Sequence, residues 1–269
     1  MPESASFDSV VCFARKLQLF RQQLQRYCQH ADVESIHDLR TSIRRLQAAY
    51  SVVPPDSRNR DSSAYLNDIQ QLFRLNSKIR DSDVIKQNLS KQLPTDHPLL
   101  AELDEIRQRE LKLARHRAIE LAKLPLPILA AGSNTDSRQR ERKIRRRALR
   151  IIERQTLVIA QPQQSEELHE LRKDIKKLFY LLELGEPVPG RSRIEHLKRV
   201  QRKAGAIRDC DINLAFLSQH RADPRISKSL YKSERKRRNR YFVDLCKALQ
   251  TRRWNKLLAV TAALGSNKG

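Results

Sequence analysis

Glycine and proline are scarce in this chain of 269 residues, with six glycines and eleven prolines. They lie almost entirely outside the segments in which apolar residues recur with helical spacing. The remainder is rich in Leu, Arg, Lys, Gln, Ala and Glu, which are good helix formers. This composition predicts an all-α fold.

Several other features are also in short supply. The four cysteines, Cys12, Cys28, Cys210 and Cys246, show no CxxC spacing and lie inside apolar helical patterns, which argues against a zinc site or a disulfide framework. A chain of this length buries enough apolar surface to fold without a metal, so we expect no cofactor. No stretch approaches the roughly 20 apolar residues of a membrane span, and Met1 to Val11 has no basic region ahead of an apolar run. We therefore expect a cytoplasmic protein.

Charge of one sign dominates what is present. The chain has 54 Lys and Arg against 31 Asp and Glu, a net charge of +23 at neutral pH. Residues 1–134 hold 20 basic and 16 acidic residues, whereas residues 135–269 hold 34 and 15. The second half therefore carries most of the positive charge. Such a charge is typical of proteins that bind a polyanion.

The sequence contains an internal repeat. The segment IHDLRTSIRRL at 36–46 returns as LHELRKDIKKL at 168–178, and IRDSDV at 79–84 returns as IRDCDI at 207–212. The two offsets, 132 and 128, are not equal. The difference falls in loops, where changes in length cost little free energy. Each half reads as about four helices, so we expect two four-helix bundles, residues 1–132 and residues 133–269.

The first repeated segment places cations beside a core when it is drawn as a helix. Leu39, Ile43, Leu46 and Tyr50 share one side with Ile36, and Leu168, Leu171, Ile175, Leu178 and Leu182 do the same in the second copy. Polar residues lie along the edge of each apolar face. They are His37, Arg40 and Arg44, here called the first-half stripe, and His169, Arg172 and Lys176, here called the second-half stripe.

Repeated rows of cations are unfavourable unless anions lie between them. Guanidinium groups match the oxygens of phosphate, lysine adds a point charge, and histidine can donate a hydrogen bond. Cations one helical turn apart, about 6 Å, suit successive phosphate groups on a chain. Single phosphate or sulfate ions have the same chemistry.

The second repeated segment supplies supporting residues. We expect Arg80 and Arg208 to face ligand or core, while the neighbouring carboxylates hold guanidinium groups in place. Those carboxylates are Asp81 and Asp83 in the first copy and Asp209 and Asp211 in the second. Further cations are expected to extend the basic wall, namely Arg74, Lys78, Arg202 and Lys203, while Arg45, Lys173 and Lys177 point further outward.

His-x-x-Arg-x-x-x-Arg-Arg on one helix, followed by Arg-Asp-x-Asp-Val on another, each with a second copy, resembles the CHAD family, the conserved-histidine α-helical domain. The resemblance covers nearly the whole chain. It implies two bundles related by pseudo-twofold symmetry, a basic central groove or channel that binds inorganic polyphosphate, and no catalysis of its own. The residues that it marks are His37, Arg40, Arg44, Arg45, Arg80, His169, Arg172, Lys176, Lys177 and Arg208. Lys176 and Lys177 depart from the family pattern, in which Arg is usual. Association with polyphosphate granules is the corresponding expectation for localisation.

Two other functions fit parts of the pattern. A helical protein that binds the backbone of RNA or DNA would use the same charge, although aromatic residues make up only 5% of the chain and no known nucleic-acid-binding signature appears. A metal-dependent polyphosphate hydrolase would use Asp81, Asp83, Asp209 and Asp211. Each DxD pair adjoins an arginine that competes for the carboxylates, so we expect neither a metal site nor an enzyme.

Overall fold

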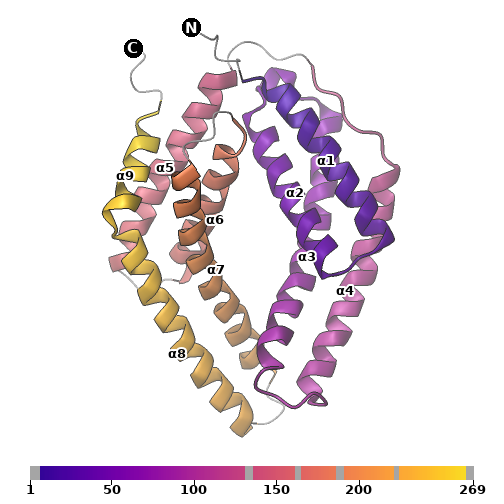
Figure 1. Cartoon of the computed structure of the whole chain (residues 1–269). Helices are drawn as coiled ribbons and strands as arrows, with labels where there is room; N and C mark the ends of the chain where they lie inside the picture. Colours follow the sequence, from indigo (N-terminus) through magenta and orange to yellow (C-terminus); the bar gives the residue numbers. More distant parts are fainter. Residues whose placement is uncertain (1–6, 131–135, 161–164, 186–190, 221–223, 265–269) are drawn as a thin grey trace.

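The computed structural model describes residues 7–130, 136–160, 165–185, 191–220 and 224–264. All regular elements in these ranges are helices, which confirms the all-α prediction (Figure 1). The first half contains α1 (Ser9–Gln29), α2 (Val33–Val52), the 3₁₀ turn η1 (Pro55–Ser57), α3 (Arg60–Leu89) and α4 (Pro98–Lys123). The second half contains α5 (Asp136–Ala160), α6 (Ser165–Leu182), α7 (Arg191–Gln219), α8 (Pro224–Leu249) and α9 (Arg252–Ala262).

Local sequence explains where several helices begin. The carboxylates of Asp8 and Asp32 accept hydrogen bonds from backbone amides in the first turn of α1 and of α2. Asn59 and Ser62 form a capping box at the start of α3. Pro98 and Pro224 are the first residues of α4 and α8, positions at which proline needs no amide hydrogen.

The helices pack in corresponding pairs in the two halves. α1 packs on α2 as α5 packs on α6, and α3 packs on α4 as α7 packs on α8. This order is consistent with the repeat. The expected boundary near residue 132 lies outside the described residues.

The second half also has a helix that the sequence pattern did not predict. α9 follows α8 after a break at Gln250–Thr251 that contains neither proline nor glycine. It packs on α5, whereas in the first half it is α4 that packs on α1. The side chain of Thr251 accepts a hydrogen bond from the amide of Trp254 and caps α9. The second half thus has five helices among its described residues, not four.

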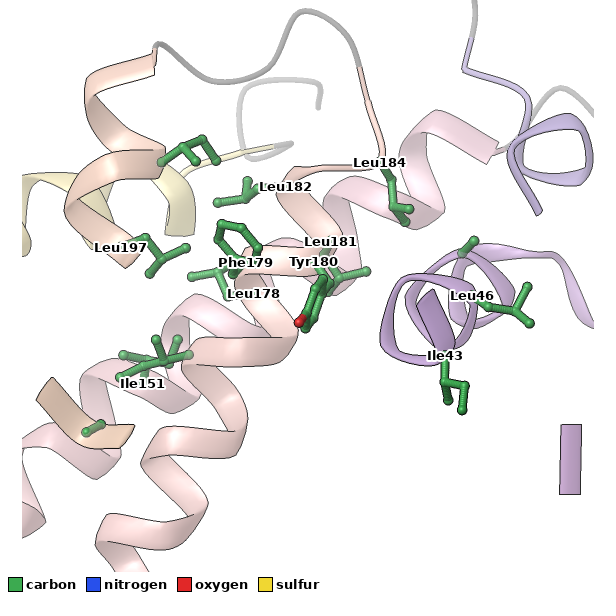
Figure 2. Close-up of a cluster of buried hydrophobic side chains, with 14 of the residues drawn as sticks. Ile43, Leu46, Ile151, Leu178, Phe179, Tyr180, Leu181, Leu182, Leu184 and Leu197 are labelled. Carbon is green, nitrogen blue, oxygen red and sulfur yellow. The ribbon is translucent and has the colours of Figure 1, made fainter. Parts of the chain in front are cut away.

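The apolar core joins the two halves in two places. In one, the end of α6 and the turn after it contact α2, and Figure 2 shows Tyr180, Leu181 and Leu184 on the side toward Ile43 and Leu46. The other lies where α3 approaches α7, and its buried residues are Ile85, Leu89, Leu93, Leu99, Leu100, Leu103, Ile212, Phe216, Leu217 and Leu230. We call these regions the two apolar junctions. Within the described ranges no helix is both long and apolar enough to cross a membrane.

Trp254 anchors α9 and provides a test of this packing. Its side chain is fully buried, and its indole nitrogen donates to Gln155 Oε1 at 2.6 Å. Trp254→Ala removes this contact and leaves a cavity, so we expect a loss of about 3–5 kcal/mol in the free energy of unfolding, measured by urea titration. Val260→Ala, at an exposed position on the same helix, is the control. Equal small losses for both variants would contradict the packing of α9 on α5.

Candidate functional site

The two stripes lie on the middle turns of α2 and α6, at the edge of the core. Leu39, Ile43, Leu171 and Ile175 are all fully buried, as the helical wheel predicted. Burial of these residues fixes the rotation of each helix about its axis. The cations one residue further along each helix are consequently held at the border between core and solvent, and Arg40, Arg44, Arg172 and Lys176 are all partly buried.

The two stripes face each other across the interface between the halves. α2 packs on α6. Burial, and after it the charges of Arg44, Arg172 and Arg40 in that order, lower the pKa of Lys176 to about 6. Burial likewise lowers the pKa of Arg172, with Arg208 and Arg44 as the strongest neighbouring cations. Cations from α2 and α6 therefore act on one another directly.

The second repeated motif links the halves reciprocally beside the stripes. Arg208 Nη2 on α7 lies 3.6 Å from Asp81 Oδ2 on α3. In the other direction, burial raises the pKa of Asp209 above its ordinary value, and Arg80 is the strongest of the cations that oppose the rise. Burial also raises the pKa of Asp81, opposed first by Arg208 and then by Arg40. Each Arg-Asp pair of one half thus meets the pair of the other half.

The outer aspartates of the motif tie neighbouring helices together within each half. Arg107 Nε donates to Asp83 Oδ1 at 2.7 Å, which connects α4 to α3. Arg238 Nε donates to Asp211 Oδ1 at 2.6 Å, which connects α8 to α7 in the same way. These contacts confirm that motif carboxylates hold guanidinium groups, and they fix the helices that carry Arg80 and Arg208.

Comparison with known proteins identifies the family. The family model for the CHAD domain matches residues 12–218 of the 269. The chain belongs to the CHAD family. The crystal structure of the CHAD domain from the plant Ricinus communis has a similar fold, with a TM-score of 0.59 over 98% of this chain and 96% of that chain at 16% sequence identity. No curated protein matches the sequence.

Seven of the residues predicted from the motifs come together in this CHAD domain. We call them the interface cluster: Arg40, Arg44, Arg80, His169, Arg172, Lys176 and Arg208. Burial lowers the pKa of His169, with Arg172 as the strongest neighbouring cation. Its counterpart His37 is exposed. The histidines of the two repeated segments therefore have different environments despite their equivalent places in the repeat.

The remaining predicted cations lie elsewhere or bind other partners. Arg45 Nε lies 3.3 Å from Glu183 Oε2, close to the apolar junction of α2 and α6. Lys78 donates to Glu110 of α4 at 3.1 Å, and Lys173 pairs with Glu170 on its own helix. Arg74, Lys177 and Arg202 are exposed, and Lys203 is partly exposed. None of these seven is among the main electrostatic neighbours of Arg40, Arg172 or Lys176.

Two residues that contact the first-half stripe, Phe73 and Ser77, were not predicted from the sequence. Arg40 Nη1 donates to Ser77 Oγ at 2.6 Å, and its guanidinium lies 4.8 Å from the centroid of the Phe73 ring. Arg44 lies 5.2 Å from the same centroid. Phe73 and Ser77 precede Arg80 by seven and three residues, so helical spacing already places them on its face. Comparison of the two copies does not point to Phe73 and Ser77, because the equivalent residues 201 and 205 of the second half are Gln and Gly.

The aspartates weighed as metal ligands are directed at arginines instead. Asp81, Asp83 and Asp211 each have a guanidinium nitrogen within 3.6 Å. Within the part of the chain that the structure describes, no three His, Cys, Asp or Glu side chains gather in a way that could hold a metal ion.

The low pKa of Lys176 predicts how stability varies with pH. An unfolded lysine has a pKa near 10.4, whereas Lys176 in the folded protein has a pKa of about 6. Between these values the unfolded chain binds one more proton, so the contribution of Lys176 to stability falls as pH is lowered from about 10 to 6.

We expect this dependence to disappear in Lys176→Met. Urea unfolding at pH 7 and pH 9 gives the comparison, and groups common to both proteins cancel in the difference. The free energy of unfolding of the wild type relative to the variant should rise with pH, by at most about 1.4 kcal/mol per unit. Parallel pH profiles would show that Lys176 is charged in the folded protein.

Proposed function

We propose that this CHAD protein binds inorganic polyphosphate between the first-half and second-half stripes and catalyses no reaction. The observation that supports this most directly is the interface cluster itself. Arg40, Arg44 and Arg172 are like charges from two helices, and together with burial they oppose a charge on Lys176 as well. A polyanion between the helices turns this repulsion into attraction.

The spacing of the cations favours a linear chain of phosphates over a single ion. Arg40 and Arg44, and likewise Arg172 and Lys176, are separated by one helical turn, a rise of about 6 Å. Arg80 and Arg208 continue the cationic surface onto α3 and α7. Phosphate or sulfate would occupy one position of this surface, whereas polyphosphate would span several and release more counterions on binding.

Binding to the backbone of a nucleic acid is the second candidate, favoured by the net charge of +23. Stacking of bases has little support, because the Phe73 ring already contacts the guanidinium groups of Arg40 and Arg44, and Trp254 is fully buried. Competition between polyphosphate and single-stranded RNA at equal phosphate concentration separates the two candidates. Preferential binding of RNA would favour the second.

The absence of catalysis is part of the proposal and has its own test. A metal-dependent hydrolase would need its aspartates free, and in this protein Asp81, Asp83 and Asp211 face arginines. Release of orthophosphate from polyphosphate in the presence of Mg²⁺ or Mn²⁺, abolished by Asp209→Asn, would overturn it.

The polyphosphate site is tested by reversing charge on both stripes. Arg44→Glu combined with Lys176→Glu introduces two carboxylates where phosphates are expected, so binding of long-chain polyphosphate should weaken by at least tenfold. The matched control is Lys232→Glu with Lys236→Glu, which changes two exposed cations on α8.

Affinity is measured in a salt titration, and circular dichroism monitors the helices. The control should bind more tightly than the stripe variant at every salt concentration and show a smaller loss relative to wild type. Binding of the stripe variant at full strength, with native helicity, would place the polyphosphate site elsewhere.

A further inference from the structure

The two stripes differ in the contacts that their cations already make with other protein groups. In the first half, Arg40 donates to the hydroxyl of Ser77 at 2.6 Å and lies against the Phe73 ring. The guanidinium of Arg44 also lies against the Phe73 ring, 5.2 Å from its centroid. Donors of Arg40 that bind protein atoms are not available to an anion.

The corresponding cations of the second half have no such contacts. Arg172 Nε is buried without a hydrogen-bond partner. Among the described residues, neither Arg172 nor Lys176 has a hydrogen bond or an ion pair within 4 Å. A buried donor without a partner costs free energy, which a ligand oxygen can recover.

The sequence repeat explains this difference. The offset of 128 that relates Arg80 to Arg208 also relates Ser77 to Gly205, so α7 has no hydroxyl where α3 has one. A Cβ atom built on Gly205 would meet no atom within 4 Å, which shows open space at this position. Arg208, three residues further along α7, is the strongest cation acting on Arg172. Arg172 therefore lies near the face of α7 that carries Gly205 and Arg208.

We propose that the second-half stripe is the anchoring subsite for one phosphate group of the polyanion, bound by Arg172 and Lys176 beside Gly205, and that Lys176 takes up a proton when this phosphate binds. This inference rests on the proposed function, and it specifies which of the two stripes contributes most to binding. No covalent bond forms, since the amine of Lys176 becomes an ammonium with a proton from the buffer.

Proton uptake follows from the surroundings of Lys176. Burial lowers its pKa to about 6, assisted by Arg44, Arg172 and Arg40, while Asp209 of α7 opposes the effect. At pH 8 the free protein therefore holds a neutral amine at this position. An anion beside it favours the ammonium form, so binding and protonation stabilise each other. Affinity should then fall with rising pH, by up to tenfold per unit above pH 6.

The location of the anchor is tested with tripolyphosphate, a ligand short enough to report on one subsite. Arg172→Ala should weaken its binding by at least tenfold, whereas Arg40→Ala, the matched control, should weaken it by less than threefold. Gly205→Ser should also weaken binding, because Arg172 can turn toward the new hydroxyl and donate to it, as Arg40 donates to Ser77. Adding Ser77→Gly to Gly205→Ser should restore affinity and make it depend on Arg40.

Proton uptake is measured by titration calorimetry at pH 8 in buffers of different ionisation enthalpy. His169 and the phosphate groups of the ligand are common to the wild type and to Lys176→Arg, so the difference in proton uptake between the two proteins reports on Lys176. We expect the wild type to take up about one proton per site more than Lys176→Arg, whose guanidinium is always charged. The affinity of Lys176→Arg should fall less steeply than that of the wild type as the pH rises from 6 to 8.

The outcomes separate this inference from the proposed function. No binding of polyphosphate by the wild type would overturn both. Binding with equal losses for Arg40→Ala and Arg172→Ala would overturn the anchor alone. Binding without proton uptake would overturn the role of Lys176.

Discussion

Repulsion between two rows of cations is the constraint on which the arrangement of this protein depends. The stripes on α2 and α6 face each other, and nothing in their own chemistry holds them together. The two apolar junctions supply that force, one between α2 and the end of α6 and the other between α3 and α7. Hydrophobic burial outside the polar region thus keeps like charges at close range.

The reciprocal Arg-Asp pairs reduce the cost of this arrangement. Arg208 pairs with Asp81 across the interface, and Arg80 acts in the same sense on Asp209. These carboxylates offset part of the positive charge without filling the stripes. Asp83 and Asp211 serve a different purpose, because they bind arginines of α4 and α8 and hold α3 and α7 in place. Within one motif, therefore, the first aspartate moderates the field and the second fixes the scaffold.

The two copies of the repeat have diverged, so the two stripes of the site are not equivalent. Ser77 and Phe73 engage Arg40 and Arg44, while Gln and Gly stand at the equivalent positions of α7. The replacement of Arg by Lys in the second-half stripe has a related consequence. A guanidinium keeps its charge in a buried cationic setting, whereas an ammonium can lose its proton. The cations of the second-half stripe therefore make fewer contacts with other protein groups, and their charge is more sensitive to pH.

The sequence by itself determined the helical class, the rotation of α2 and α6, and the cations at their edges. These features follow from local spacing and from burial of residues such as Ile43 and Ile175, and the structure bears them out. The sequence did not reveal α9, because no proline or glycine marks its start. It also could not show which of the cations marked by the family resemblance meet at the interface, since Arg44 and Arg45 are marked alike and Arg45 pairs with Glu183. Only tertiary packing decided which cations meet across the interface, because that depends on how α2, α3, α6 and α7 approach one another over distances that no local pattern encodes.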